Sequence, residues 1–431
     1  QYWFILESFR AVNSLKHKNI KSLNRCLTEN SPLEDLQAAL EKEQRKNERA
    51  KHRLIGITLE TRPDAISPKT IYHMRRLGCT RIELGLQAPD DKILELIKRG
   101  HTVQQFRDAT QLLRQAGFKV DLHFMPDLPG SSPDHDIEMY RSLFSDHGLR
   151  PDMIKIYPNT VIPSAQLYRW YLDGRYKPYG EKELFRALLQ MKLDTPRYCR
   201  ISRLVRDIPE TEIAAGNKIT NLREALAAEL KKRGLSCQCL RCREIGRRGN
   251  EEMTKLRNGG KPKLYIETYE TTGGTEYFLS FEDQQRIAVF AFLRLRIPTS
   301  GHSEEPSDDG IYNGLPRSRA AQARNDRRGV LYRLLPEIRG CAFIRELHTY
   351  GQLVSIGTRA KEASQHKGLG KLLVRKAERI AKKHGYNKIA VISGVGVRGY
   401  YRKLGYRKCG TYMGKALRFV IYIPLCYDVR A

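Results

Sequence analysis

The stretch Gln365-His366-Lys367-Gly368-Leu369-Gly370 decides the fold of the C-terminal half, because a helix begins within it. Apolar residues recur at steps of three and four from Leu369 to Ala381, which predicts an amphipathic helix. Gly368 and Gly370 carry no β-carbon, so a ligand can reach the N–H groups of the first turn at the positive end of the helix dipole. The stretch therefore predicts a pyrophosphate seat, and the alternative is a turn with a plain helix cap.

Strands are expected on both sides of this helix. One covers residues 345–351, a shorter one covers residues 353–357, and an apolar strand covers residues 388–393. The pair Tyr400-Tyr401 and then Gly405-Tyr406 follow the last of these strands. The order of strand, Gln-x-x-Gly-x-Gly, helix, strand and tyrosine pair resembles the GNAT acetyltransferase family.

This resemblance implies that the glycine loop binds the pyrophosphate of acetyl-CoA and that Tyr400 or Tyr401 protonates the leaving CoA thiolate. A phenol suits that step because its pKa of about 10 lies close to that of an alkyl thiol. Core packing is the alternative for the tyrosine pair. His348 is a candidate base, although a single histidine in a strand is more often packed and hydrogen-bonded. The expected acetyl-CoA contacts are Glu346, Leu347, His348, Thr349, Gln365, His366, Lys367, Gly368, Leu369, Gly370, Lys371 and Tyr400.

The chain of 431 residues is long enough for two or three domains, and 40% of its residues are hydrophobic, which excludes a disordered tail. Its formal net charge of +29 predicts a polyanionic partner, and nucleic acid is the first candidate. An anionic membrane is the weaker alternative, since no apolar run reaches the ~20 residues of a membrane span. Nine cysteines without a secreted disulfide pattern favour a reducing cytoplasm.

Residues 54–157 alternate between short strands and helices. The strands are expected at 54–59, 81–86, 119–125 and 153–157, with helices at 67–77, 103–116 and 133–144 between them. Such alternation predicts an α/β domain with a parallel sheet or barrel. Because barrel chemistry lies at the carboxyl ends of the strands, four side chains are expected at the barrel mouth. They are Glu60, Glu83, Gln87 and His123.

Five segments resemble the radical S-adenosylmethionine (SAM) domain of the catalytic subunit of Elongator. They cover residues 60–64, 78–87, 99–102, 123–130 and 155–158. Together with the GNAT-like half, the resemblance covers essentially the whole chain. It implies acetyl-CoA-dependent modification of tRNA wobble uridine at C5 (carboxymethylation) by a radical mechanism, with hydrolysis of acetyl-CoA on tRNA binding. The implied cofactors are acetyl-CoA, SAM and a 4Fe-4S cluster, and the implied partner is a tRNA anticodon stem-loop. The resemblance also allows a homodimer or, in larger relatives, other Elongator subunits.

The cysteines depart from that family. Radical SAM proteins hold their cluster with three closely spaced cysteines near the start of the barrel. No such motif precedes Leu54, because Cys26 and Cys79 each stand alone. We therefore expect that the first strands and the cluster loop are missing from the chain as given, and that this chain alone does not generate a radical.

The segment that follows the alternating region is strongly basic. Residues 197–263 hold 17 Lys and Arg against 8 Asp and Glu. A charged, solvated face is the alternative, but the excess of one sign favours contact with tRNA phosphates. The expected contacts are Arg200, Arg203, Arg206, Lys231, Lys232, Arg233, Arg241, Arg243, Arg247 and Arg248.

Three cysteines lie within this basic segment, in the run Cys237-Gln238-Cys239-Leu240-Arg241-Cys242. Such close thiols in a cytosolic protein favour a metal site, and a closed zinc site needs four ligands. The fourth ligand is not local, so Cys199 or a barrel histidine is a candidate, and free reduced thiols are the alternative. The position after the barrel speaks against the radical cluster and for a structural zinc.

Three domains are expected: a partial radical SAM-like barrel over residues 1–196, a basic zinc-binding linker over residues 197–260 and a GNAT domain over residues 261–431. The polar segment 299–329 is expected to be an irregular insertion. Two other functions stay open, namely a protein lysine acetyltransferase with the barrel as a docking scaffold, and a non-catalytic RNA-binding module. A parallel barrel joined to a basic linker favours the tRNA-modifying enzyme.

Overall fold

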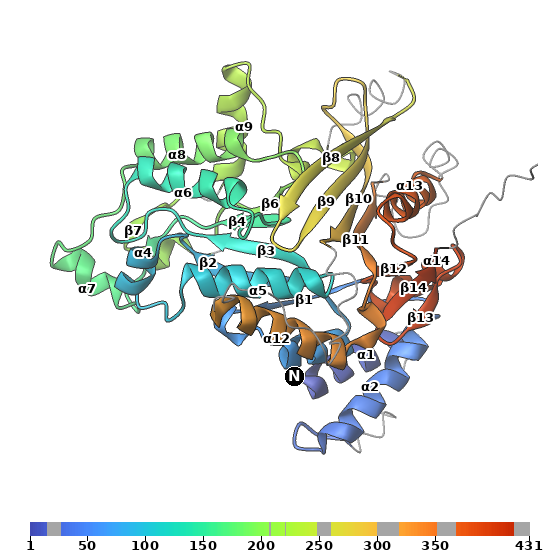
Figure 1. The fold of residues 1–431 in the computed structure, drawn as a ribbon. Helices are drawn as coiled ribbons and strands as arrows, with labels where there is room; N and C mark the ends of the chain where they lie inside the picture. The colour runs from blue at the N-terminus through green and yellow to red at the C-terminus, as the bar shows by residue number, and fades with distance from the viewer. Residues whose placement is uncertain are drawn as a thin grey trace, which may run out of the picture.

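The computed structural model describes residues 1–14, 27–206, 208–219, 221–247, 260–299, 319–350 and 368–417. The first half of the chain forms a five-stranded sheet and the second half a seven-stranded sheet (Figure 1). A short pair, β5 (Thr160–Val161) and β7 (Ala215–Gly216), belongs to neither. The predicted site residues Gln365, His366, Lys367 and Arg248, and the strand expected at 353–357, lie outside the described residues.

The five-stranded sheet is parallel throughout, as the alternation of strands and helices predicts. Its order follows the chain: β1 (Ile57–Thr61), β2 (Cys79–Gln87), β3 (Lys119–Phe124), β4 (Met153–Ile156) and β6 (Arg200–Arg203). The predicted α/β class with a parallel sheet is therefore confirmed. Strand β6 extends this sheet past residue 196, into the segment that the sequence assigns to the linker.

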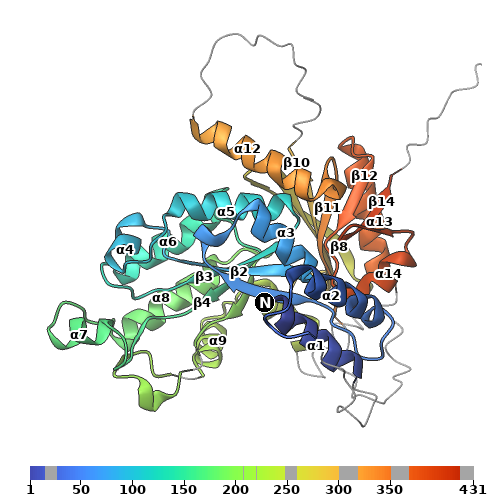
Figure 2. The ribbon, with the colours of Figure 1, turned by 90° about the horizontal axis from the view of Figure 1, so that it is seen from below.

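Capped helices connect these strands. They are α3 (Pro68–Arg76), α4 (Asp91–Leu96), α5 (Val103–Gln115), α6 (Pro133–Ser145) and α8 (Glu181–Asp194). The hydroxyls of Ser67 and Thr102 accept backbone N–H groups of α3 and α5, and each forms a reciprocal capping box. Figure 2 shows α5 and α6 along one side of the sheet. Their apolar faces bury strand residues such as Leu84 and Leu122 completely.

The seven-stranded sheet has the order β13-β14-β12-β11-β10-β9-β8. The strands are β8 (Lys263–Thr271), β9 (Gly274–Glu282), β10 (Val289–Pro298), β11 (Ala342–Thr349), β12 (Lys388–Val391), β13 (Arg407–Cys409) and β14 (Tyr412–Ala416). Only β11 and β12 pair in parallel, and their register covers three residues, 342–344 against 389–391. Beyond that register the two strands separate, and the predicted helix α13 (Leu369–Lys383) packs on β9, β10 and β11.

The remaining helices surround these sheets. They are α1 (Tyr2–Ser14), α2 (Leu33–Asn47), α7 (Leu167–Leu172), α9 (Leu222–Lys232), α10 (Leu240–Arg243), α12 (Arg319–Leu334) and α14 (Arg398–Arg402). Helix α12 begins inside the segment 299–329 that was expected to be irregular, and it packs on α3 and α5 of the barrel. Among the described helices, none has the length and apolarity that crossing a membrane requires.

Buried ion pairs join the two sheets at a seam between the domains. Arg345 of β11 donates to both oxygens of Asp152 at the start of β4, at 2.8 and 2.5 Å, and also to Glu276 at 3.0 Å. Arg294 of β10 donates to the backbone oxygens of Tyr198 and Asp152. These side chains are at most 1% exposed, so the seam fixes the acetyltransferase-like sheet against the amino ends of the barrel strands.

Candidate functional site

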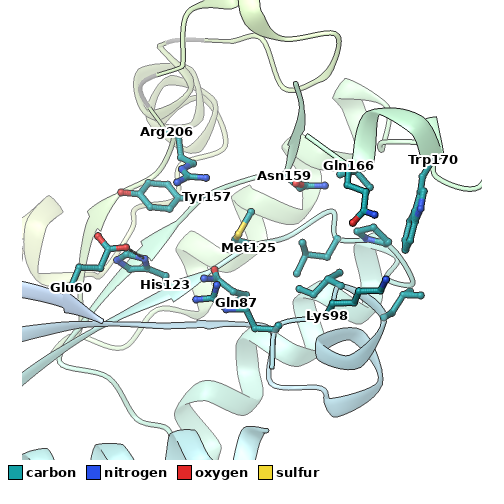
Figure 3. A pocket seen from close by; sticks show the side chains of 16 residues that line it. Glu60, Gln87, Lys98, His123, Met125, Tyr157, Asn159, Gln166, Trp170 and Arg206 are labelled. Carbon is teal, nitrogen blue, oxygen red and sulfur yellow. Dashed lines mark ion pairs between the residues drawn. The ribbon is translucent and has the colours of Figure 1, made fainter. Parts of the chain in front are cut away.

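The carboxyl ends of the barrel strands surround a cavity of about 430 Å³. Figure 3 shows Glu60, His123 and Tyr157 at one end of this mouth cavity and Trp170 at the other, with Met125 between them. The side chains from β1 and β3 reach the cavity because residues at these strand ends point inward from neighbouring parallel strands. The structure therefore brings together residues that lie about 110 positions apart in the chain.

Two carboxylates flank the ring of His123. Its Nδ1 lies 3.6 Å from an oxygen of Glu60, and its Nε2 lies 3.6 Å from an oxygen of Glu83. Lys155 of β4 also donates to Glu83. The neighbouring His123 ring, together with the Lys155 ammonium, lowers the pKa of Glu83 to about 2 against the effect of burial. Since Lys155 already neutralises Glu83, the group suits recognition of a polar ligand better than enclosure of a metal ion.

Gln87, the last residue of β2, has an unusual backbone. Its φ of 76° lies in the left-handed region, which a glutamine adopts rarely, and the pairing of β2 with β3 shifts register between Gly85 and Gln87. The Gln87 carbonyl accepts the N–H of Met125 at 2.8 Å, and its side chain lines the mouth cavity. Strain held by surrounding bonds is common where a side chain must be aimed at a ligand.

Four further residues of the mouth were not among the site residues predicted from the sequence, and a fifth, Arg206, was predicted only as a tRNA contact. The guanidinium carbon of Arg206 lies 5.6 Å from the ring centre of Tyr157, above the cavity. Tyr157 and Asn159 flank Pro158, which the sequence placed at a strand end, so that position was a usable signal. Arg99 lies in the segment 99–102 that carries the resemblance, which was also a usable signal, whereas Trp170 on α7 offered none, because tertiary contacts set the position of that helix.

A second cavity, of about 730 Å³, continues from the mouth into the barrel and shares Glu60, His123 and Tyr157 with it. Charged side chains line its walls. Burial raises the pKa of Asp121 to about 6, and the Ser202 hydroxyl donates to that carboxyl at 3.0 Å. We call this cavity the barrel lumen.

The mouth fits SAM in its donor set. It offers the Glu60 carboxylate, the Gln87 amide and the His123 imidazole, whose buried Nε2 has no hydrogen-bond partner among the described residues. It does not offer ligands for an iron-sulfur cluster. Cys79 lies at the opposite end of β2, and the one close cysteine group among the described residues lies in the basic segment. We therefore derive no reaction step through a cluster.

The predicted pyrophosphate seat lies at the start of α13. Gly368 has a φ of 112°, a left-handed conformation that favours glycine, and it is the residue before the first helical turn with Leu369 and Lys371. A β-carbon on Gly370 would lie 2.8 Å from the Tyr400 hydroxyl and 3.3 Å from a methyl group of Thr349. The structure thus brings Gly370, Thr349 and Tyr400 together.

The gap between β11 and β12 leads from this seat to a third cavity, of about 340 Å³. The predicted residues Glu346, Leu347, His348 and Tyr401 line it. Glu346 accepts a hydrogen bond from Arg294 at 2.9 Å. Tyr401 is 6% exposed, and burial raises its pKa, so its hydroxyl stays protonated. Tyr400, by contrast, is 39% exposed and lies at the seat instead of in this cavity.

The three cysteines of the basic segment come together. The sulfur atoms of Cys237, Cys239 and Cys242 all lie within 4.8 Å of one another. Cys199 carries a backbone carbonyl that accepts the N–H of Leu240, but its sulfur is not in the group. Among the described residues, no histidine or carboxylate completes the group either, so the structure does not bring the suggested fourth ligands to it.

The predicted tRNA contacts have different environments. Arg243 is 2% exposed, and its guanidinium bonds Glu282 at 2.9 Å and the carbonyls of Gln238 and Arg197, so its prediction as a phosphate contact is wrong. Arg200 and Arg247 both pair with Glu244. Burial and neighbouring arginines lower the pKa of Arg241 to about 10. The exposed members of the set are Arg203, Arg206, Lys231, Lys232, Arg233 and Arg247.

A basic pocket that the sequence did not indicate lies where α2 meets α14 and β13, with a volume of about 740 Å³. Its cationic members are Arg45, Lys46, Arg49, Arg402 and Lys408. Glu48 offsets part of this charge, since it pairs with Arg398 and Arg402. The charges come from both ends of the chain, so no local run of sequence could reveal them.

Comparison with known proteins agrees with this architecture. Residues 10–143 match the radical SAM superfamily, residues 151–232 the radical SAM C-terminal domain and residues 287–406 the acetyltransferase (GNAT) family. The chain is 41% identical over 97% of its length to a tRNA uridine(34) acetyltransferase from Methanocaldococcus infernus, and 37% identical over 97% to one from Dehalococcoides mccartyi. It is 37% identical over 86% to human Elongator complex protein 3.

The chain spans 69%, 79% and 62% of these three relatives, respectively. A solved structure of an archaeal Elp3 from Methanocaldococcus infernus, with residues 1–46 deleted, matches with a TM-score of 0.75 and 38% identity, over 96% of this chain and 86% of that one. The radical SAM matches precede the GNAT match along this chain, as expected. The chain therefore belongs to the family of tRNA uridine(34) acetyltransferases and Elongator complex protein 3.

Proposed function

We propose that the chain takes part in acetyl-CoA-dependent modification of wobble uridine at C5 (carboxymethylation) in tRNA, by binding tRNA and hydrolysing acetyl-CoA when tRNA is bound; the radical step itself needs a cluster for which the described residues offer no ligands at the mouth. The observation that carries the proposal is the cavity between β11 and β12, because its walls come from both domains. The acetyltransferase sheet supplies Glu346 and His348, and the amino end of barrel strand β2 supplies Arg81. Arg81 lines both this cavity and the barrel lumen, and the lumen continues to the mouth. An acetyl group in this cavity would therefore be separated from the mouth by the lumen alone.

Acetyl-CoA fits the acetyltransferase domain from its pyrophosphate to its thioester. The pyrophosphate would accept hydrogen bonds from the free N–H groups that follow Gly368. The pantetheine arm would lie along the backbone edges that β11 and β12 leave unpaired beyond residues 344 and 391. We assign the proton donor for the thiolate to Tyr401, because it lines the cavity beside Glu346 and remains protonated.

SAM fits the barrel mouth, where Glu60 would pair with its ammonium group and Gln87 and His123 would bind its polar atoms. When bound and reduced in the radical SAM family, this cofactor supplies the radical that the chemistry at C5 needs. The aromatic rings of Tyr157 and Trp170 offer stacking surfaces for an unstacked base, which is how single-stranded RNA is read.

Zinc fits the group of Cys237, Cys239 and Cys242, which offers three of the four ligands of a tetrahedral site. The group anchors the basic segment to the barrel, because Leu240 within it donates to the Cys199 carbonyl beside β6 at 2.8 Å. We assign the zinc a structural role. Metal analysis of the purified protein should then give about one zinc per chain.

The tRNA phosphates would contact the exposed cations of the basic segment, above all Lys231, Lys232 and Arg233 at the end of α9. Phosphate neutralisation makes such binding steeply salt-dependent, with a slope of about −0.7 to −0.9 per contact in a plot of log affinity against log salt. The test is acetyl-CoA hydrolysis measured with tRNA, without RNA and with a basic peptide. We expect stimulation by tRNA alone, whereas stimulation by the peptide alone would indicate a protein lysine acetyltransferase.

A charge-reversal variant sharpens this test. Changing Lys231, Lys232 and Arg233 to Glu should weaken tRNA binding by about tenfold or more at moderate salt and remove the stimulation, while acetyl-CoA binding stays unchanged. The matched control reverses Arg327, Arg333 and Arg339, which carry the same charge near α12, on the other side of the barrel sheet (Figure 1). Equal loss of tRNA binding in both variants would refute a specific site on α9.

A further inference from the structure

The cavity between β11 and β12 has a wall that belongs to the barrel. Thr80, Arg81 and Lys119 reach it from the amino ends of β2 and β3. Opposite them stand His348 and Tyr401 of the acetyltransferase domain. A barrel amine and the predicted acetyl-binding residues thus line one cavity of about 340 Å³.

Lys119 is the first residue of β3, and its backbone partner across the sheet is Arg81. Its ammonium lies 3.4 Å from the Thr80 hydroxyl, which is a long contact. No carboxylate among the described residues lies within ion-pair distance of it. Lys155 offers the contrast, since the same type of side chain in the neighbouring strand pairs directly with Glu83. Among the described residues, Lys119 therefore makes one long hydrogen bond and no ion pair, and it lines the cavity.

The charges around Lys119 favour its neutral form. Burial lowers its pKa from the usual value, and the Arg81 charge lowers it further. Glu346 acts in the opposite direction, but its carboxylate is engaged by Arg294 at 2.9 Å. Cys79 and Asp152 are the other groups that raise this pKa. A larger fraction of Lys119 is thus a neutral amine than for a lysine on the surface, and the neutral amine is the nucleophile.

We propose that Lys119 is a self-acetylation site, at which the side-chain amine accepts the acetyl group of acetyl-CoA bound between β11 and β12. This inference rests on the proposed function, because it requires the thioester to lie in that cavity. The reaction forms an N–C bond between Nζ of Lys119 and the acetyl carbon, and it breaks the C–S bond of the thioester. The products are Nε-acetyllysine and free CoA thiol, and no other reactant takes part.

The cavity also holds groups for both protons. The attacking amine loses one proton, which the His348 imidazole can accept, and the leaving thiolate takes one from the Tyr401 hydroxyl. Acetylation prevents Lys119 from carrying a positive charge at the amino ends of the barrel strands, beside Arg81. Since Lys119 lies on the same face of β3 as Asp121 and His123, the modified side chain would lie at the inner end of the barrel lumen.

The test is mass spectrometry of the full chain after incubation with acetyl-CoA. Cleavage after aspartate releases residues 109–121, in which Lys119 is the one lysine. We expect Lys119 to acquire an acetyl group about tenfold faster than the exposed Lys231 and Lys232, because the bound thioester is held next to it. Unfolded protein should lose this preference. The Tyr401→Phe variant should slow the acetylation at Lys119 but not at the two surface lysines.

Calorimetry with acetyl-CoA separates the possible failures. If acetyl-CoA binds but Lys119 acquires the label no faster than Lys231, the self-acetylation site is wrong and the proposed function stands. If acetyl-CoA does not bind, the proposed function and this inference both fail. Acetyl phosphate, which lacks the CoA part, serves as the control donor and should not reproduce the preference of about tenfold for Lys119, because nothing holds it next to that amine.

Discussion

The domain seam and the barrel mouth are both rich in charge, but the two regions use it differently. At the seam, Asp152 and Arg345 are at most 1% exposed and bond each other directly. At the mouth, Glu60 is 64% exposed, and one of its oxygens lies 3.6 Å from the Nδ1 of His123. A buried charge needs a partner within the folded protein, because burying it unpaired is costly. A partly solvated charge stays hydrated and can bind a ligand instead. The comparison shows that charge at the seam fixes the domains and charge at the mouth is available for binding.

The largest expected effect comes from breaking the seam. Asp152→Asn should lower the free energy of unfolding by about 3 kcal/mol, because it removes the shared carboxylate of two buried guanidiniums and leaves Arg345 with Glu276 alone and Arg294 with Glu346 alone. The measurement is denaturant unfolding at neutral pH. Although burial raises the pKa of Asp152, the two arginines hold it below its usual range. Its contribution is therefore present above about pH 4 and is lost as pH falls further.

The matched control is Asp173→Asn, which removes a carboxylate of an exposed ion pair with Arg175. We expect no measurable change in stability for this control, because exposed pairs contribute little. If Asp152→Asn unfolded at the same denaturant concentration as the wild type, the seam would not be held by charge and the contrast with the mouth would disappear.

A second prediction concerns the carboxyl group that supports the wall of the mouth. Burial raises the pKa of Asp127 to about 7. Its carboxylate accepts the N–H of Tyr179 at 3.1 Å, and its carbonyl accepts the Tyr176 hydroxyl. Between about pH 4 and 7 the folded chain holds a proton that the unfolded chain releases, so stability falls as pH rises through that range.

Asp127→Asn should therefore raise the free energy of unfolding by about 1–3 kcal/mol near pH 8 and change it little near pH 4. Asparagine also tolerates the left-handed backbone at this position, where φ is 67°. The check is thermal unfolding across the pH range. A stabilisation of equal size at both pH values would show that the carboxyl group does not titrate in this way.

The two regions also differ in how far the sequence predicts them. Residues of the mouth follow from the pattern, because strand ends are visible in the sequence and parallel strands place their carboxyl ends together. Glu60, Gln87 and His123 line the mouth for this reason, whereas Glu83, which was also expected at the mouth, lies in the middle of β2 and lines the barrel lumen. The seam is invisible to the pattern, since Arg345 and Asp152 lie 193 positions apart and nothing local marks either as a partner.

The basic segment shows a second limit of the sequence. Its excess of positive charge is a property of composition, but each arginine has its own surroundings. Arg243 is buried against Glu282 of β9, whereas Lys231 and Lys232 are exposed on α9. A count of charges predicts a polyanionic partner and cannot say which side chains reach it. The sequence also did not indicate Lys119 as a site residue, because the cavity that it lines forms only where β3 faces β11 and β12, which are distant in the chain.

A third prediction tests the acetyl-CoA seat, which lies outside the seam and should not affect stability to the same extent. Gly370→Val should weaken acetyl-CoA binding by about tenfold or more, because a β-carbon there lies 2.8 Å from the Tyr400 hydroxyl and fills the approach to the helix. Calorimetry measures the affinity. The control is Gly399→Ala, since a β-carbon on that glycine meets nothing within 4 Å.

The smallest effect on stability should come from the mouth itself. Glu60→Gln should change the free energy of unfolding by no more than about 0.5 kcal/mol, because the side chain is 64% exposed. Its neighbour Glu83 provides the contrast: Lys155 and His123 hold its pKa at about 2, so Glu83→Gln should cost about 1–2 kcal/mol at neutral pH.

Ligand binding should depend on Glu60 more strongly than stability does. S-adenosylhomocysteine, used as a stable probe in calorimetry, carries the ammonium group that Glu60 is proposed to bind. Glu60→Gln should therefore weaken its binding several-fold while the protein stays as stable as the wild type. A loss of stability with unchanged binding would place Glu60 with the charges of the seam, and the distinction between charge that fixes the fold and charge that awaits a ligand would fail at this residue.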